Sequence, residues 1–185
     1  MSHGGNVIEE LTTDHREVES LFQRIQSLPA EDPQRRALAD ELTIELVRHS
    51  VAEEEHLYPA VRAHVDDGAA LAEKEISDHA RVERLLKDLE SARPGEHAFE
   101  ATLEQLREEV MQHVADEESR LFTLLQDACS AEQLDKLGDK VRRAKKTAPT
   151  RPHPSAPDRP PANRILAPGA GLVDRARDLI TGRGR

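Results

Sequence analysis

One pattern, His-x-x-x-Glu, occurs twice in this chain with an offset of 64 positions: His49 with Glu53, and His113 with Glu117. A single histidine precedes each copy at the same offset, which gives the pair His15 and His79. On an α-helix, residues i and i+4 lie one turn apart on the same face, so each imidazole points the same way as its carboxylate. We interpret the chain as a tandem duplication. Two such halves packed face to face bring four His and two Glu together, which is a ligand set for two metal ions.

Apolar residues at helical spacing predict four long helices, over about residues 7–27, 32–59, 69–92 and 96–129. Short connections between long helices predict antiparallel neighbours. The expected fold is therefore all-α, an antiparallel up-down-up-down four-helix bundle with internal duplication. Pro59 is expected to kink or end the second helix. A short C-terminal helix is expected over residues 130–146, with a cap signal that begins at Ser130.

The composition favours helices and gives no sign of a membrane protein. Aromatic residues make up 2% of the chain and charged residues 34%, so the core has to be built from Leu, Val, Ile and Ala. No apolar run approaches the roughly 20 residues that a membrane span needs. The N-terminal residues resemble no export signal, and the single cysteine, Cys129, suits a reducing compartment. We expect a cytoplasmic protein that is a monomer or a weak dimer.

The net charge of −10 hides two regions of opposite charge. Residues 141–185 carry 11 Lys/Arg and 3 Asp, a net +8, which leaves 15 basic and 33 acidic residues and a net −18 for residues 1–140. Proline is dense over residues 147–168, which predicts a disordered linker, and a short basic amphipathic stretch follows it. We therefore expect a bundle domain over residues 1–146 and a tail over residues 147–185. Loose docking of the basic tail on the acidic body is expected, although an anionic partner such as nucleic acid or a membrane surface is the alternative.

The histidines and glutamates interrupt apolar helix faces, and this is the argument for metal. A buried carboxylate without a counter-charge costs several kcal/mol. Metal ions remove this cost, because they balance the carboxylates and occupy the imidazole lone pairs. The alternative for one isolated His-x-x-x-Glu is a pair of solvated surface residues. Two copies, together with both single histidines on apolar faces, favour the metal site.

The ligand types indicate which metal the site holds. Imidazoles combined with two carboxylates favour a non-haem di-iron site over structural zinc, which prefers thiolates and closed tetrahedral shells. Each glutamate is suited to bridge the two metals, while the histidines fill terminal positions and leave room for O2, peroxide or water. Magnesium and calcium prefer oxygen ligands, whereas manganese or a pair of zinc ions remains open.

These residues resemble the signature of the hemerythrin-like HHE cation-binding family, which reads H, HxxxE, H, HxxxE. The stretch from His49 to Pro59 is especially similar to that family's second helix, and the resemblance covers about residues 7–128. It implies a four-helix bundle with an oxo- or hydroxo-bridged centre of two non-haem iron ions. The family includes O2 carriers, sensors of O2, iron or redox state, and members that act on peroxide or nitric oxide.

The chain departs from the O2-carrying hemerythrins. The resemblance implies for those proteins a ligand set of five histidines with Glu and Asp, and two of the histidines lie one turn apart on the third helix. Here that helix offers Glu75 or Glu83 at the corresponding turn, so stable O2 carriage is in doubt. His56 shares the face of His49 and is a candidate fifth imidazole, but its repeat partner is an arginine. The alternative for His56 is a partly exposed residue at the bundle end.

Other residues near the site are expected to act without binding metal. Glu19 and Glu83, each one turn after a single histidine, are expected to be hydrogen-bond partners or solvated. Tyr58 and Phe122 occupy the same repeat position and are expected to form a wall. The Tyr58 phenol would also be close enough to donate a hydrogen bond to a bound oxygen species.

Several functions fit this site. The leading interpretation is a di-iron protein that binds or processes O2 or reactive oxygen species, with catalase-like turnover of H2O2 as a candidate activity. The second is a sensor or binding module, without turnover, whose iron or redox state changes the presentation of the tail. A ferritin-like iron oxidase is disfavoured, because such bundles use Glu-x-x-His on two helices. A helical interaction module without metal is the remaining alternative.

Overall fold

The structure is a computed structural model that describes residues 4–154 and 162–181. All regular secondary structure within these residues is helical, which confirms the expected all-α class. Two of the long helical runs are single helices: α1 (Val7–Ser27) and α4 (Gly68–Ser91).

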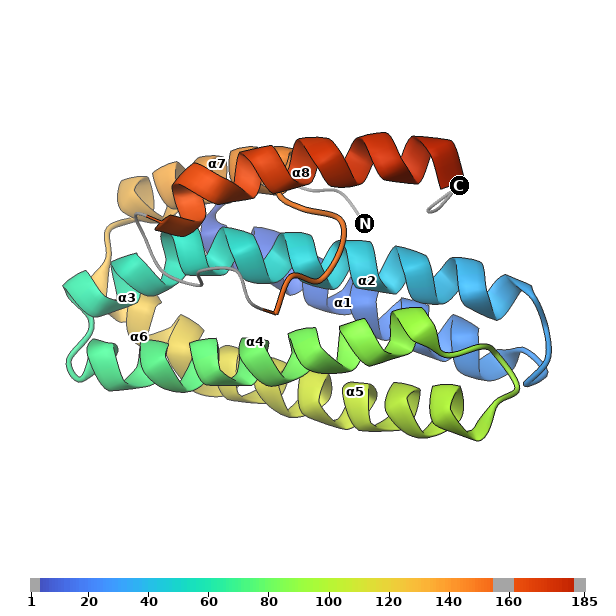
Figure 1. Cartoon of the computed structure of the whole chain (residues 1–185). Coiled ribbons are helices and arrows are strands. Elements are labelled where there is room, and N and C mark those ends of the chain that lie inside the picture. Colours follow the sequence, from blue (N-terminus) through green and yellow to red (C-terminus); the bar gives the residue numbers. More distant parts are fainter. Residues whose placement is uncertain (1–3, 155–161, 182–185) are drawn as a thin grey trace.

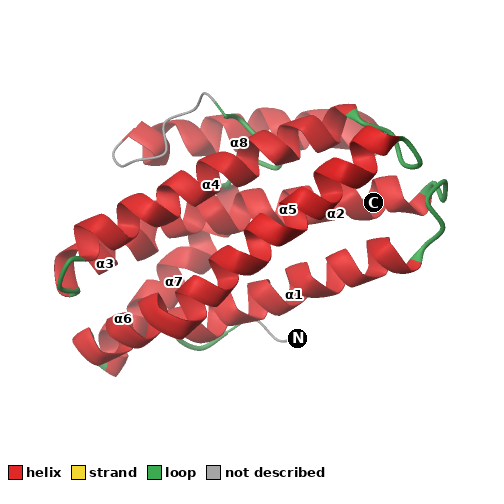
Figure 2. Cartoon of the chain, turned by 90° about the horizontal axis from the view of Figure 1, so that it is seen from below, coloured by secondary structure: helices red, strands yellow, loops and turns green. Residues whose placement is uncertain are grey.

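Each of the other two long runs contains a turn of π-helix. The first of them comprises α2 (Gln34–Ala52), η1 (Glu53–Leu57) and α3 (Tyr58–His64). The second comprises α5 (His97–Asp116), η2 (Glu117–Leu121) and α6 (Phe122–Ala128). Figures 1 and 2 show the four runs side by side, with consecutive runs in opposite directions.

The helix that was expected to kink or end at Pro59 continues to His64. Its π turn is closed by the N–H of Tyr58, which donates to the carbonyl of Glu53, five residues earlier. The same π turn occurs in the second half of the chain, where the residue equivalent to Pro59 is a threonine. Proline is therefore not the cause of the π turns, which are a property of both repeats.

Two apolar clusters fill the bundle, one on each side of the histidine layer. The first joins residues of α1, α2, α4 and α5, with Phe22, Leu42, Leu86 and Leu106 among its buried members. The second surrounds the π turns and also includes the apolar face of α7 (Ala131–Thr147). The layer that carries the His-x-x-x-Glu motifs is thus closed off at both ends by aliphatic side chains.

The fifth helix, α7, packs on α1, α2 and η1 (Figure 1). It begins with a capping box, in which Ser130 accepts from the N–H of Gln133 and Gln133 accepts from the N–H of Ser130. Gly138 allows it to approach the start of α1, because a Cβ there would lie 2.9 Å from the carbonyl oxygen of Gly5. The short C-terminal helix expected over residues 130–146 is therefore present and belongs to the core.

The disordered linker expected over residues 147–168 stays a prediction. In the described part of that range, Ala148, Thr150, Arg151 and His153 make hydrogen bonds, and α8 (Ala162–Thr181) is a helix of 20 residues that lies beside α7 (Figure 1). Buried Asp174 accepts from the N–H groups of Thr150 and Arg151, and Arg151 also pairs with Glu90 of α4. These polar tertiary contacts supply the order that the low apolar content did not predict. Residues 155–161 lie outside the described part of the chain.

The described part of the basic stretch near the C-terminus turns acidic side chains inward. Its apolar residues Leu172 and Val173 are 67% and 64% exposed, whereas Asp174 and Asp178 are buried. No helix within the described residues combines the length and the apolar character that crossing a bilayer requires.

Candidate metal centre

Six of the seven expected ligands meet in one layer of the bundle. The single histidines come from α1 and α4, the histidines of the two motifs from α2 and α5, and the glutamates are the first residues of η1 and η2. One group of potential donor atoms, all within 4.8 Å of one another, contains His15, His49, Glu53 and Glu117. Two further groups satisfy the same limit: Glu53 with His79 and His113, and Glu75 with His113 and Glu117. Glu53 therefore belongs to the first and second groups, and Glu117 to the first and third.

The π turns determine where the glutamate neighbours point. A π turn contains one more residue than an α turn, so consecutive side chains spread differently around the helix. Glu53 points into the layer, while Glu54 beside it reaches the imidazole of His79. Glu117 and Glu118 have the same relationship to the imidazole of His15. Both repeats thus direct two adjacent carboxylates to different parts of one site.

His56 does not join the cluster. Its Nε2 lies 3.7 Å from a carboxylate oxygen of the adjacent Glu55, its side chain is 19% exposed, and it belongs to none of the three donor groups. Regular α-helical spacing would place His56 on the same helix face as His49. The π turn between the two residues changes that spacing, which is the physical reason for the difference.

The six converging side chains are almost completely buried, with exposures between 0% for the two glutamates and 5% for His79 and His113. Burial alone would lower the pKa of His49, but the charge of Glu53 and the hydrogen bond to Asp14 raise it to about 10. Burial alone would raise the pKa of Glu53, but His49 and His79 hold it well below its usual value. Without metal, His49 and Glu53 hold each other in their charged forms inside the layer.

Each imidazole also has a carboxylate partner on its outer nitrogen. The four Nδ1-to-oxygen distances run from 2.7 to 3.2 Å, and the pairs are His15–Glu118, His49–Asp14, His79–Glu54 and His113–Glu75. This carboxylate–histidine arrangement is the common second sphere of metal sites, because it fixes the ring and its tautomer and leaves Nε2 for the metal. In this protein it leaves all four Nε2 atoms directed toward the centre.

The outer carboxylates differ from those that the sequence suggested. Glu19 pairs with Arg16, and Glu83 accepts from the backbone N–H of His153. The sequence did contain a signal for two of the carboxylates that contact the site histidines, because Glu54 and Glu118 are themselves 64 positions apart. Glu75 has no acidic counterpart in the first repeat, so the duplication does not identify it.

Tyr58 makes the centre asymmetric. Its hydroxyl lies 3.1 Å from Oε1 of Glu117, 3.3 Å from Oε2 of Glu53 and 3.1 Å from Nε2 of His79. Burial, together with the negative charges of the two glutamates, raises the pKa of this phenol well above its usual value. The equivalent residue of the second repeat, Phe122, stacks on the His15 ring with a centroid distance of 5.7 Å and offers no hydroxyl.

A small apolar cavity adjoins the imidazoles. Its volume is about 10 Å³, close to the space of one water-sized probe. The ten lining residues form five repeat pairs, which are His15/His79, Val18/Val82, Leu46/Val110, His49/His113 and Ser50/Val114. The cavity is therefore a shared feature of both halves, and its volume corresponds to about one water-sized molecule.

Three buried atoms at the centre lack a hydrogen-bond partner among the described residues: Nε2 of His15, Oε1 of Glu53 and Oε2 of Glu117. Buried polar atoms are rarely left in this state, because the cost is about 1–3 kcal/mol for each group. All three belong to the converging set and are donor types that iron accepts. The residues present therefore fit a metal centre.

Comparison with known proteins agrees with this geometry. The hemerythrin HHE cation binding domain matches residues 6–125. An uncharacterized hemerythrin-like protein of Schizosaccharomyces pombe is 30% identical over 175 residues, which cover 94% of this chain and 86% of that protein. A DNA nickase of Nostoc sp. is 30% identical over 141 residues, which cover 76% of this chain but only 39% of the nickase.

A solved structure shares the fold. The crystal structure of a hemerythrin HHE cation binding domain-containing protein from Mycobacterium kansasii matches with a TM-score of 0.67 and 25% identity, over 76% of this chain and 85% of that one. With the family match extending over most of the bundle, and with His15, His49, His79 and His113 gathered in one buried layer, this chain belongs to the hemerythrin HHE cation-binding family.

Proposed function

We propose that the protein holds two non-haem iron ions in the buried layer, one beside His15 and His49 and the other beside His79 and His113. The observation that carries this proposal is the shared position of the two glutamates. Glu53 lies within reach of both histidine pairs, and Glu117 is grouped with His15 and His49 and also with His113. A carboxylate that faces two sets of imidazoles is suited to bridge two metal ions.

The choice of iron rests on the donor set. Four imidazoles and two carboxylates, with no thiolate among them, suit iron better than a structural zinc site. The sequence contains a single cysteine, Cys129, and it belongs to none of the donor groups. A reducing cytoplasm, in which Fe(II) is available and Cys129 stays a thiol, is the compartment that we propose for the protein.

We further propose that the centre binds or processes O2 or reactive oxygen species, with H2O2 as the candidate substrate for turnover. The cavity of about 10 Å³ beside the imidazoles has room for about one water-sized molecule, and half of its lining residues are aliphatic. Two iron ions supply a store of two electrons, which is what the disproportionation of H2O2 requires without an external reductant. The protein contributes enclosure, since both apolar clusters exclude bulk water from the layer.

Residues of the chain are suited to donate and to hold protons at the centre. Tyr58 has the only phenol in the sequence, and its hydroxyl lies among the groups that face the centre. It is positioned to donate a hydrogen bond to an oxygen species bound there, as a general acid would. The four outer carboxylates keep the imidazole Nδ1 protons in place, so the rings present Nε2 and do not rotate.

The decisive experiment is metal analysis of the purified protein after anaerobic loading with Fe(II), followed by exposure to air and an absorption spectrum. We expect about two irons per chain and a near-ultraviolet band of an oxo-bridged pair. Oxygen release from added H2O2 then tests turnover. A folded protein that takes up no iron, or that binds a single zinc and refuses iron, contradicts the di-iron assignment. Iron uptake without oxygen release favours the second candidate, a sensor of iron, oxygen or redox state.

A further inference from the structure

A lysine of α7 contacts the outer carboxylate of His49. The Nζ atom of Lys145 donates to Oδ1 of Asp14, while Oδ2 of the same carboxylate lies 3.2 Å from Nδ1 of His49. Lys145 also donates to Oε1 of Glu10 at 2.9 Å. Its side chain is only 13% exposed, although it lies in the last turn of its helix. A continuous chain of contacts therefore runs from α7 to the proposed metal centre.

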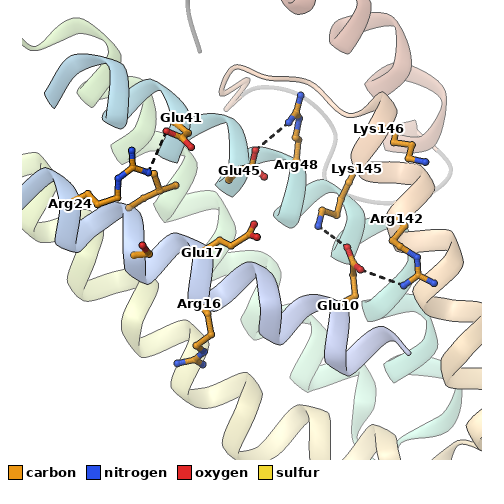
Figure 3. A pocket seen from close by; sticks show the side chains of 12 residues that line it. Glu10, Arg16, Glu17, Arg24, Glu41, Glu45, Arg48, Arg142, Lys145 and Lys146 are labelled. Atoms are coloured by element: carbon orange, nitrogen blue, oxygen red, sulfur yellow. Dashed lines mark hydrogen bonds and ion pairs between the residues drawn. The ribbon is translucent and has the colours of Figure 1, made fainter. Parts of the chain in front are cut away.

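Lys145 lies in the wall of a groove between α1, α2 and α7 (Figure 3). The groove has a volume of about 950 Å³ and is lined by both acidic and basic side chains. In Figure 3, Lys145 extends from α7 toward Glu10, which Arg142 also contacts. Burial alone would lower the pKa of Lys145, but Asp14 and Glu10 raise it, so the group is a cation. Lys146, the next residue, lines the same groove, is exposed and makes no ion pair with the described residues.

The second repeat has a different arrangement. Asp78, the repeat equivalent of Asp14, pairs with Lys74 and Arg81, while the carboxylate beside His113 is that of Glu75, whose Oε1 lies 3.3 Å from Nζ of Lys74. Lys74 is 45% exposed, so its charge is more strongly screened by water than that of Lys145. Because α7 follows both repeats in the sequence, Lys145 has no repeat equivalent. Among the described residues, Lys145 is thus a mostly buried cation that reaches an outer carboxylate of the site from outside the duplication, whereas Lys74 belongs to the second repeat and is more exposed.

We propose that Lys145 is a positioning residue for the metal centre, which acts through Asp14 on His49. Asp14 is buried beside Glu10, and without the lysine these two carboxylates would face each other with less counter-charge. Asp14 would then turn away from His49, which would lose the acceptor that fixes its ring. The inference rests on the proposed metal binding at this site and adds to it a specific role for the fifth helix.

The test uses matched variants of the full-length protein. Fe(II) affinity is measured by anaerobic competition with a chelator, and the absorption spectrum of the oxidised, iron-loaded protein is the second readout. We expect Lys145→Met and Asp14→Asn to weaken iron binding by roughly 10- to 100-fold and to shift the spectrum. Lys146→Met and Asp78→Asn are the controls, in the same helix and at the same repeat position, and should stay within about twofold of the wild type. Lys145→Arg, which keeps the positive charge, should retain most of the wild-type affinity for Fe(II).

The double variant Asp14→Asn/Lys145→Met separates a positioning role from a general loss of stability. If Lys145 acts through Asp14, the double variant binds iron no more weakly than Asp14→Asn alone. Additive losses, or a Lys145→Met protein with wild-type affinity and spectrum, would overturn the inference. If Lys145→Met fails to fold, as judged by circular dichroism, the comparison of Asp14→Asn with Asp78→Asn decides instead, and equal affinities of these two variants overturn the inference. A wild-type protein that binds no iron overturns the proposed function, whereas iron binding that these variants leave unchanged overturns this inference alone.

Discussion

The Nδ1 atom of His15 lies 2.7 Å from Oε1 of Glu118, a residue 103 positions later in the chain. The equivalent contact in the other direction joins His79 to Glu54 at 3.0 Å. Each repeat therefore orients the single histidine of the other repeat. The aromatic residues follow the same rule, because Phe122 stacks on His15 and Tyr58 packs against His79. Neither half contains a complete site, and the two halves form one centre only when they are packed together.

Loss of a ligand should remove metal and also stability. We expect His49→Ala or Glu117→Ala to lose iron and to destabilise the protein by about 3 kcal/mol, because the remaining buried charges lack a partner. For a chain of this size that corresponds to a melting temperature lower by roughly 10 °C. His64→Ala and His97→Ala, at exposed positions outside the layer, are the controls and should change neither quantity. Identical behaviour of all four variants would show that the layer is not a metal site.

Removal of the Tyr58 hydroxyl should affect the metal-free protein most. In Tyr58→Phe the ring still fills its buried position, but Glu117 and Glu53 lose a hydrogen-bond donor inside the bundle. We expect the free energy of unfolding of the metal-free form, measured with urea, to fall by about 1–3 kcal/mol. The iron-loaded form should lose less, because the metal takes over the carboxylates. If the wild type turns over H2O2, the variant should be slower by roughly 100-fold. Equal rates would exclude the phenol as a proton donor.

The stability of the metal-free protein should depend on pH through His49. Its pKa is about 10 in the folded protein, against an ordinary value of 6.5. A raised pKa of this kind contributes stability that is fully present below about pH 6.5 and is lost as the pH rises through 10. Urea unfolding of the metal-free protein between pH 6 and pH 10 should therefore show a falling free energy. His49→Ala should flatten the profile, and a free energy that rises over this range in the wild type would contradict the assignment.

The domain boundary at residue 146 is still a prediction. A chain that ends at Lys146 keeps α7, including Lys145, and should therefore keep its full iron content. We expect its melting temperature to stay within about 2 °C of the full-length value, a change below about 1 kcal/mol. The contacts most directly removed are polar ones, such as Arg151 with Glu90. Loss of iron, or unfolding of the shortened chain, would show that the tail is part of the bundle core.

Much of the site was predictable from the sequence, because the duplication repeats residue types at a fixed offset. The spacing of His49 and Glu53, and of their counterparts 64 positions later, required only that both segments be helical. Helical periodicity is a local property, and the aliphatic faces of the four long helices express it clearly. The family resemblance and the convergence of six side chains followed from that local information.

Other features depended on tertiary structure. The π turn that begins at Glu53 keeps His56 out of the donor groups, and α-helical spacing cannot reveal that turn. The tail was expected to be disordered because it has few apolar residues, yet Asp174 is buried against residues 150 and 151 by hydrogen bonds. The contact of Lys145 with Asp14 joins residues 131 positions apart in the chain. A sequence pattern shows which residues share a helix face, but the packing of distant helices determines which charge meets which, because those contacts depend on positions in space.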